Sequence, residues 1–230
     1  MSAKFETRDI VVPGDLLFEG RARAGDNTYR NEGNIYATRV GLANYNKDRV
    51  SVIALEAGFI PLVGDLVIGM VTDIELGQWK VDIGAENEAI LTTNDAIGKP
   101  FRSYQDMTKI LDVGDTIVAK IVDLDRRRTP ILSIMGRDLG KARDGFLIDI
   151  TPSKIPRLIG KKGSMINMIL KETRCQVTIG QNGKILISGR NRENEELVVK
   201  VIKKIEAEAH TSGLTNRIQE YLKDIKEQRK

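Results

Sequence analysis

Cysteine and histidine are almost absent from this sequence, which contains one of each, Cys175 and His210. A single cysteine cannot form an internal disulfide, and without a His/Cys cluster there is no ligand set for zinc. Cys175 lies in a predicted strand, where we expect a small buried residue. His210 ends a polar helix, where we expect a surface position rather than a catalytic one. The sequence therefore predicts no metal and no cofactor.

Long apolar runs are also missing, since no stretch approaches the length needed to span a membrane. The first nine residues, Met1 to Asp9, are too charged for a signal peptide. A reduced lone thiol fits a reducing compartment. We therefore expect a soluble intracellular protein, cytoplasmic and without a membrane partner.

A recognisable catalytic set is absent as well, because neither a nucleophile–base pair nor a phosphate-cradling P-loop occurs. Asp123 and Asp125 could suggest a pair of metal-binding carboxylates. Residues two apart on a strand share a face by simple alternation, however, and the arginines that follow indicate a charged turn. The sequence therefore favours a protein that is not an enzyme.

Charge is distributed unevenly along the 230 residues, a length that suits two or three small domains. Residues 151–230 carry 17 lysines and arginines against nine carboxylates, a net charge of +8. Residues 1–150 carry a net charge of −4, which gives +4 for the chain. The carboxy-terminal third is thus the part that faces a polyanion.

Two glycines enclose two lysines at Gly160-Lys161-Lys162-Gly163, between two helical patterns. Glycine permits positive φ and close backbone approach, and lysine supplies mobile cations. The following helix begins with unpaired N–H groups at the positive end of its dipole. Such a loop can bind the phosphate backbone of a nucleic acid.

The context of this loop is specific. A strand-like run, 146–150, and a short helix, 153–159, precede it, and a helix with a predicted buried stripe at Ile166, Ile169, Leu170 and Thr173 follows. Two alternating strands, 175–179 and 184–188, flank a Gln-Asn-Gly hairpin turn. A helix from about 192 to 209 closes the unit, with Leu197, Val198, Val201, Ile202 and Ile205 on its buried face.

This order, with the IGKKG loop, resembles a type I KH domain (βααββα) over 146–210. The resemblance implies a clamp for single-stranded RNA in which Gly160, Lys161, Lys162 and Gly163 hold the backbone and Ile159 and Ile166 line the groove floor. Arg157 and Arg174 stand where many KH domains have glycine. Arg157 adds charge beside the loop, and Arg174 implies a differently shaped helix end. A KH fold used only for protein contacts is the alternative.

Upstream, a Val-Gly-Asp turn feeding an alternating strand occurs twice, at 62–74 and 112–124. Strands at 79–84, 88–91 and 130–134 bring the total to five, which suggests a small closed β-barrel. The segment resembles the OB-fold barrel of ribosomal protein S-one, which stacks RNA bases on aromatic side chains.

Trp79 matches one stacking aromatic of that family, whereas Leu76 occupies the other aromatic position and Thr92 falls near an expected histidine. Trp79 could equally fill the core. The remaining candidates for RNA contact are charged or polar loop residues: Arg102, Tyr104, Arg126, Arg127 and Arg128.

Residues 1–62 form a further β-rich module with alternating strands at 35–40 and 49–55 and a predicted hairpin loop at 25–33. The module shows no site chemistry and is best interpreted as a docking surface.

The whole order resembles the KH-domain cap subunit of the archaeal exosome, with a docking module at 1–62, an OB barrel at 63–137, a KH domain at 146–210 and a helical extension at 211–230. The resemblance implies three copies on a ring of phosphorolytic nuclease subunits, with RNA capture by this chain and cleavage by its partners. A transcription-elongation or translation-linked RNA-binding factor with OB and KH domains is the alternative.

Overall fold

The computed structural model of the chain describes residues 2–46, 48–55, 58–100, 102, 106–142, 145–209, 211 and 213–228. The chain divides into two compact units, Met1–Ala57 and Gly58–Lys230, and each is considered by itself. The predicted Tyr104 and His210 lie outside the described residues.

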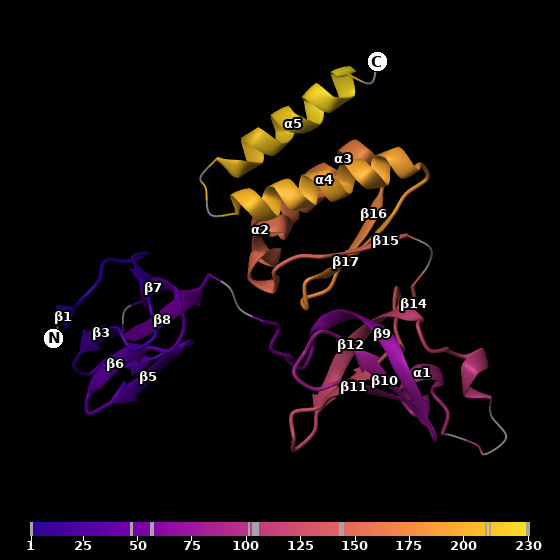
Figure 1. Ribbon diagram of the computed structural model, residues 1–230, viewed down its shortest axis with the longest axis horizontal. Helices are drawn as coiled ribbons and strands as arrows, with labels where there is room; N and C mark the ends of the chain where they lie inside the picture. Colours follow the sequence, from indigo (N-terminus) through magenta and orange to yellow (C-terminus); the bar gives the residue numbers. More distant parts are fainter. Residues whose placement is uncertain are drawn as a thin grey trace. The chain divides into compact units, whose positions relative to one another are not determined.

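The first unit consists of two four-stranded sheets (Figure 1). One has the order β1(Ser2–Ala3)-β3(Leu16–Glu19)-β6(Asn34–Ala37)-β5(Thr28–Asn31), and the other β2(Ile10–Val11)-β7(Gly41–Asn46)-β8(Arg49–Ala54)-β4(Arg23–Ala24). The core of the unit includes Val11, Leu17, Ile35, Ala43 and Val52. Strand β5 lies inside the segment 25–33, so the prediction of a plain hairpin loop there is wrong.

The second unit begins with a closed five-stranded barrel. Its strands are β9(Leu66–Glu75), β10(Gln78–Asp82), β11(Ala89–Thr92), β12(Thr116–Leu124) and β13(Pro130–Ser133). The sheet has the order β13-β11-β10-β9-β12 and closes into a barrel because β12 also pairs with β13. The short strand β14(Gly140–Lys141) pairs antiparallel with the start of β12. The short helices α1(Thr93–Ile97) and η1(Met107–Lys109) lie between β11 and β12. The predicted five-stranded barrel is confirmed.

The Gly-Asp turn recurs three times with one geometry. In each turn the aspartate carboxylate accepts the N–H of the residue three positions earlier: Asp15 from Val12 at 2.8 Å, Asp65 from Leu62 at 3.1 Å and Asp115 from Asp112 at 2.9 Å. The central glycine has a φ between +90° and +99°, which a Cβ would disfavour. In the barrel, Gly64 donates to Ile121 and Gly114 donates to Val71. Each turn therefore binds the strand that the other turn opens.

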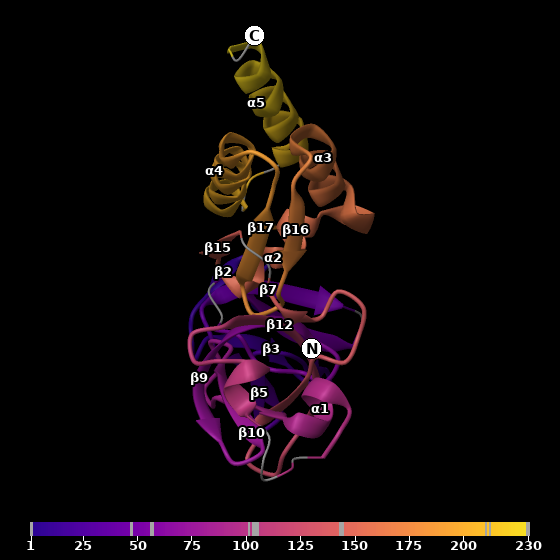
Figure 2. The same cartoon turned by 90° about the vertical axis from the view of Figure 1, so that its right-hand side faces the viewer.

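The KH domain follows, with a three-stranded sheet of order β15(Phe146–Asp149)-β17(Lys184–Ser188)-β16(Gln176–Ile179). Its helical segments are η2(Pro152–Lys154), α2(Ile155–Ile159), η3(Lys161–Gly163), α3(Ser164–Thr173) and α4(Arg192–Glu208), and α5(Leu214–Gln228) is the extension. Figure 1 shows α3, α4 and α5 above the strands of this sheet, and Figure 2 shows the same domain turned by 90°. Ile185 and Ile187 of β17 join the helices in one core, as period-two alternation requires. The predicted βααββα order is confirmed.

The predicted buried face is correct for helix α4 and only partly correct for helix α3. On α4, all five residues predicted to be buried are buried. On α3 the buried residues are Met165, Ile169 and Thr173, whereas Ile166 and Leu170 are only half-buried. The predicted α3 stripe is therefore correct at Ile169 and Thr173 but wrong at its start, where Met165 rather than Ile166 packs into the core.

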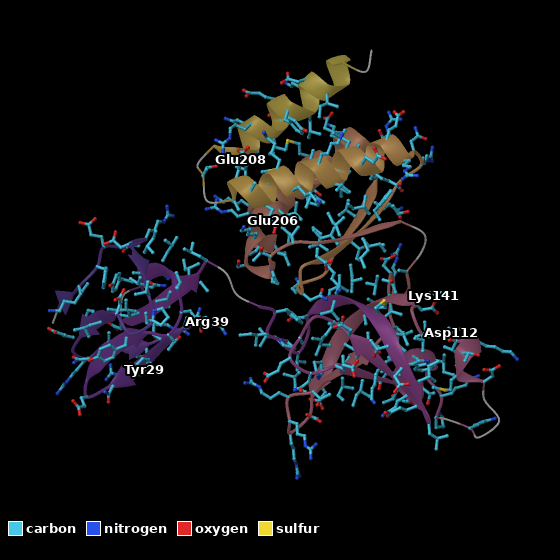
Figure 3. The ribbon with its side chains drawn as sticks, in the orientation of Figure 1. Tyr29, Arg39, Asp112, Lys141, Glu206 and Glu208 are labelled. Carbon is cyan, nitrogen blue, oxygen red and sulfur yellow. The ribbon has the colours of Figure 1, made fainter. Side chains whose placement is uncertain are left out.

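The carboxy-terminal end of α4 is tied to its surroundings by two glutamates (Figure 3). Glu206 accepts from the backbone N–H and the hydroxyl of Thr151, at 2.8 and 2.9 Å. Glu208 binds the Arg217 guanidinium of α5 at 2.8 Å. The extension also buries Leu214, Ile218 and Leu222 in the KH core. Helix α5 is thus an integral part of this domain.

The barrel and the KH domain contact each other through the turn between β16 and β17. The buried Asn182 amide donates to the carbonyls of Ile68 and Ile83, at 2.7 and 2.8 Å, and its oxygen accepts the Ile68 N–H at 3.3 Å. The backbone N–H of Gln181 also donates to the Leu66 carbonyl at 2.7 Å. The side chain of Asn182 therefore satisfies backbone groups of two barrel segments.

Apolar burial accompanies these hydrogen bonds. Ile68 and Val118 are cross-strand neighbours between β9 and β12, and both belong to the outward-facing register of the barrel. Both are nevertheless buried. An outward-facing apolar pair of this kind is stabilised only when another surface covers it, and strands β16 and β17 contact β9 at this place.

No helix within the described residues is both long and apolar enough to cross a bilayer.

We expect Asn182→Ala to uncouple the KH domain from the barrel. Loss of a buried side chain that makes three hydrogen bonds should cost about 2–4 kcal/mol. Trp79, the only tryptophan, is buried in the barrel. The helical signal comes mainly from the four α-helices of the KH region, which are five to seventeen residues long. Urea unfolding followed by Trp79 fluorescence and by circular dichroism at 222 nm should give coincident transitions for the native chain and separate transitions for the variant.

Gln181→Ala is the matched control, because the Gln181 side chain is exposed and only its backbone N–H contacts the barrel. Coincident transitions at an unchanged midpoint in Asn182→Ala would show that the contact does not couple the two domains.

A second prediction concerns acid stability. The backbone N–H of Asp112, and secondly the Lys141 ammonium 2.6 Å away, hold the pKa of Asp115 below its ordinary value. A carboxyl whose pKa falls on folding stabilises the fold above its unfolded pKa of about 4, and this contribution disappears as pH falls through the folded value. Asp115→Asn should cost about 1 kcal/mol at neutral pH.

Urea midpoints of native and Asp115→Asn chains should converge below the folded pKa of Asp115. Lys141→Gln removes the ammonium and keeps the backbone hydrogen bond, so its effect should be smaller. A midpoint difference between native and Asp115→Asn chains that is independent of pH would contradict the assignment.

Candidate nucleic-acid interface

The loop between α2 and α3 has a backbone that requires glycine. Gly160 has a φ of 73°, and a Cβ at this position would approach the Met165 nitrogen and Cβ to 2.8 Å. Gly163 has a φ of 78° and is the N-cap of α3, where no side chain caps the helix. The N–H groups of the first turn of α3 are therefore not occupied by a capping side chain, an arrangement that suits a phosphate.

The two lysines of this loop project into solvent. Lys161 and Lys162 are exposed, and no ion pair to either one occurs among the described residues. Lys162 has a left-handed φ of 54°, which is uncommon for a residue with a Cβ. Arg157, on α2, is also exposed. Three cations thus lie on or next to one short loop, and none of them forms an ion pair within the part of the chain that the structure describes.

An apolar hollow of about 350 Å³ lies beside this loop. Its lining consists of Pro152, Ile155, Pro156, Ile159, Gly160 and Gln181. Of the two isoleucines predicted for the groove floor, Ile159 lines this hollow, whereas Ile166 is half-buried on α3 and does not. The structure thus brings a small apolar surface next to the cationic loop.

The prediction that Arg174 gives α3 a differently shaped end is wrong. It takes the left-handed conformation, with a φ of 55°, and its N–H donates to the Leu170 carbonyl as the C-cap of α3. An arginine therefore adopts here the conformation for which glycine is the usual residue.

Trp79 is not available for base stacking. The alternation along β10 turns Trp79 and Val81 into the barrel, where both are fully buried. The indole N–H donates to the Leu111 carbonyl at 2.9 Å, so its polar atom is satisfied internally. The predicted RNA-stacking role of Trp79 is wrong, and the alternative of core filling describes this residue.

The other two positions at which the S-one barrel family has an aromatic residue or a histidine carry no ring in this chain. Leu76, at the turn between β9 and β10, is 85 % exposed. Thr92 caps α1, since its hydroxyl accepts the Asp95 N–H at 3.2 Å.

The outer surface of β9 and β10 is acidic rather than basic. Lys80 pairs with Glu75 at 2.5 Å and with Asp73 at 3.5 Å. The Glu75 interaction is the main cause that raises the Lys80 pKa and lowers that of Glu75. Glu88 accepts a hydrogen bond from Thr72 on the same surface. This part of the barrel therefore does not attract a phosphate backbone.

The arginine turn between β12 and β13 is the basic part of the barrel. Asp125 accepts the backbone N–H groups of Arg127 and Thr129, at 2.7 and 2.8 Å, and the Thr129 interaction is the largest cause that lowers its pKa. Arg126, Arg127 and Arg128 are exposed, and no ion pair to them occurs in the described part of the chain. One carboxylate thus orders a turn that presents three guanidinium groups.

The carboxylates considered for metal catalysis have other partners. Asp125 orders the arginine turn, and Asp123 accepts the Leu124 N–H at 2.8 Å. No group of three His, Cys, Asp or Glu residues suited to a metal ion occurs among the described residues. Arg102 is exposed on the segment between α1 and η1.

Sequence profiles of three families match this chain. They are described as the exosome RNA binding protein RRP4 N-terminal domain over 8–56, the RRP4 S1 domain over 59–123 and the KH domain over 145–193. The exosome complex component Rrp4 of Thermococcus kodakarensis is 42% identical over 96% of this chain and 89% of its own length. The chain belongs to the Rrp4 family.

Further relatives agree with this assignment. Exosome complex component Rrp4 of Methanobrevibacter smithii is 40% identical over 94% of this chain and 72% of its own length. A crystal structure of a protein provisionally named an exosome complex RNA-binding protein has a TM-score of 0.72 and 37% identity, covering 76% of this chain and all of that one. The resemblance predicted from the sequence is confirmed, and the barrel is an S1 domain.

Two features of this Rrp4-family chain were not predicted from its sequence. Asn182 lies in a Gln-Asn-Gly segment that predicts a hairpin turn and gives no sign of the barrel contact. A small hollow beside the arginine turn involves Phe59, which lies in the segment before the first barrel strand. Its only sequence signal is an isolated aromatic residue in a connecting segment.

Proposed function

We propose that this chain is a non-catalytic RNA-binding subunit of an exosome, which captures single-stranded RNA and feeds it to a 3'-to-5' exoribonuclease ring. The observation that carries this proposal is the family match over all three domains together with the unneutralised lysines of the loop 160–163. The elongation-factor alternative lacks such support, because residues 8–56 match the Rrp4 amino-terminal domain.

The mechanism is electrostatic retention of an RNA backbone. The loop lysines and Arg157 hold phosphates at the start of α3, and the hollow beside Ile159 accepts apolar base surface. The arginine turn of the S1 barrel adds a second cationic contact within the same unit. Because phosphates and not base edges supply most of these contacts, the grip has little sequence preference.

The amino-terminal module has a surface suited to a protein partner. Strand pairing places Ile10, Leu42 and Ile53 in one row across β2, β7 and β8. A second row lies two positions further along the same three segments and consists of Val12, Val40 and Leu55. In this row the Leu55 N–H donates to the Val40 carbonyl. We call these six residues the apolar face: Ile10, Val12, Val40, Leu42, Ile53 and Leu55.

Exposure distinguishes this face from ordinary sheet surface. Ile10 is 66 % exposed and Ile53 is 55 % exposed, while Val11, Ala43 and Val52 fill the opposite, core-facing side. A contiguous exposed apolar surface marks an interaction site in soluble proteins. We assign this face to docking on the phosphorolytic ring, three copies per ring, in the cytoplasm.

The RNA-binding proposal predicts that Lys161→Asp/Lys162→Asp lowers RNA affinity. Reversal of two exposed charges should weaken binding of a single-stranded 12-mer at least tenfold at low salt, similarly for different base compositions, and should reduce the salt dependence. Fluorescence anisotropy measures the affinity. Lys203→Asp, a single reversal on the exposed side of α4, is the control for net charge. Unchanged affinity in the double variant would assign the KH surface to another purpose.

The docking proposal predicts that Ile53→Asp weakens binding to purified ring subunits by more than tenfold, because a carboxylate would be buried in an apolar contact. Tyr29→Asp tests the same module on its other sheet, where Tyr29 is 46 % exposed. Native mass spectrometry of the reconstituted complex compares how much of the native chain and of each variant binds the ring, and it also gives the copy number. Intact assembly with Ile53→Asp would exclude the apolar face as the docking surface.

A further inference from the structure

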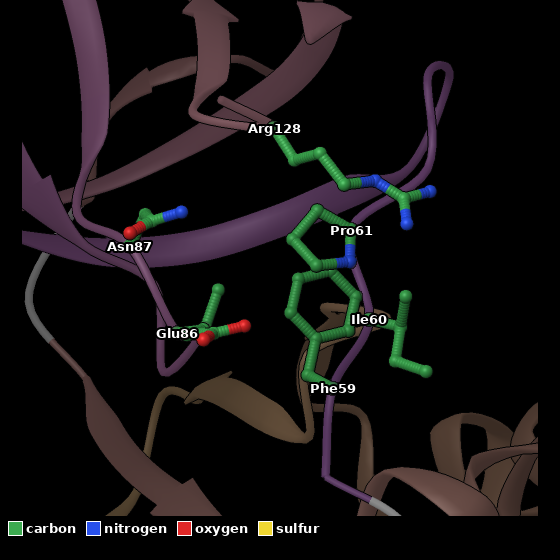
Figure 4. A pocket seen from close by; sticks show the side chains of 7 residues that line it. Phe59, Ile60, Pro61, Glu86, Asn87 and Arg128 are labelled. Carbon is green, nitrogen blue, oxygen red and sulfur yellow. The ribbon is translucent and has the colours of Figure 1, made fainter. Parts of the chain in front are cut away.

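A small hollow of about 110 Å³ lies at the edge of the S1 barrel, next to the arginine turn. Three segments line it: the chain just before the barrel, the turn after β10, and the end of the arginine turn. Figure 4 shows the rings of Phe59 and Pro61 on one side, Glu86 and Asn87 on the other, and Arg128 extending past Pro61.

The walls of this hollow are attached to the barrel. The Phe59 side chain is half-buried and packs against the barrel core. Asn87 donates from its amide to the Arg127 carbonyl at 3.3 Å, which joins the turn after β10 to the arginine turn. Arg128 has a left-handed φ of 62°, and its N–H donates to the Asp125 carbonyl at 2.9 Å. The site is therefore largely formed before any ligand arrives.

The chemistry of the lining suits one nucleobase. Phe59 offers an aromatic surface, Arg128 offers a planar cation that stacks on rings, and Glu86 accepts hydrogen bonds. Arg126 and Arg127, exposed on the same turn, can hold the phosphates on either side of such a base.

We propose that this hollow receives a single base from the RNA strand, stacked on Phe59 and contacted by Arg128. The inference rests on the RNA-binding function proposed above and adds a base contact to it. Because a carboxylate accepts and cannot donate, Glu86 favours the projecting exocyclic amino groups of adenine, cytosine and guanine. Uracil is disfavoured because its one ring donor, N3–H, lies between two carbonyl oxygens that repel a carboxylate.

The test compares a single-stranded RNA with a strand of the same length that lacks bases, and it uses the full chain. Native protein should prefer the RNA of adenines to the abasic strand. Phe59→Leu keeps an apolar side chain and removes the ring, so affinity for the adenine strand should fall about fivefold to tenfold, with little change for the abasic strand. Arg128→Gln should weaken both strands and also reduce this preference.

Two variants act as controls. Arg137→Gln removes an exposed arginine outside the hollow and should lower both affinities slightly without changing the preference. Lys161→Asp/Lys162→Asp should weaken both strands equally and leave the preference for bases intact. Failure of the KH grip is thus distinguished from failure of this pocket, because the first lowers both affinities equally and the second changes the ratio between them.

Uracil discrimination supplies the third comparison. The native chain should bind an adenine strand more tightly than a uracil strand by a few-fold, and Glu86→Gln should reduce that ratio because the amide can also donate. An unchanged ratio in Glu86→Gln would overturn the assigned role of this carboxylate.

A direct measurement keeps the proposal testable if Phe59→Leu fails to fold. Ultraviolet crosslinking of native protein to RNA, followed by mass spectrometry, should place a crosslink on Phe59. Crosslinks confined to the KH loop would overturn the proposal. It would also be overturned if Phe59→Leu left RNA affinity unchanged and instead weakened ring binding, since the hollow would then receive a protein side chain.

Discussion

The arrangement of the second unit depends on the contact that Asn182 makes with the barrel. One amide group satisfies three backbone groups on two barrel segments, and the strands on either side of its turn, β16 and β17, contact β9, which carries the outward-facing Ile68. Such a contact is expensive to break, because buried backbone groups would lose their partners. It makes the S1 barrel and the KH domain one compact unit, so the cationic turn of one and the cationic loop of the other belong to a single body.

Elements formed by local patterns were predictable from the sequence. Alternation in β17 and the five apolar positions of α4 appear in the structure as the sequence predicts. The Gly-Asp turns were also predictable, because a glycine with positive φ and an aspartate that accepts a nearby backbone N–H involve only residues close together in the sequence. The KH loop belongs to this class, because Gly160 is required by the close approach of Met165, five residues later, and Gly163 by its own positive φ.

Features that depend on distant residues were not predictable. Asn182 binds partners 114 and 99 residues away, and a Gln-Asn-Gly turn has the same local sequence whether or not it contacts a barrel. The role of Trp79 differs, because a signal was present. Polar Gln78, Lys80 and Asp82 alternate with Trp79 and Val81, and this pattern assigns the tryptophan to the inner face. The family resemblance outweighed the alternation in our prediction.

The position of the cations accounts for the kind of RNA grip that we propose. On the strand surface where an S1 barrel would stack bases, Lys80 is already neutralised by Glu75 and Asp73. The cations that we assign to RNA contact lie instead on the arginine turn and at the start of α3. Separate contacts to phosphates hold a strand at intervals, and at each contact solvent ions can replace the phosphate. A strand held in this way can advance when one contact opens while another holds, which a continuous set of base-specific contacts would oppose.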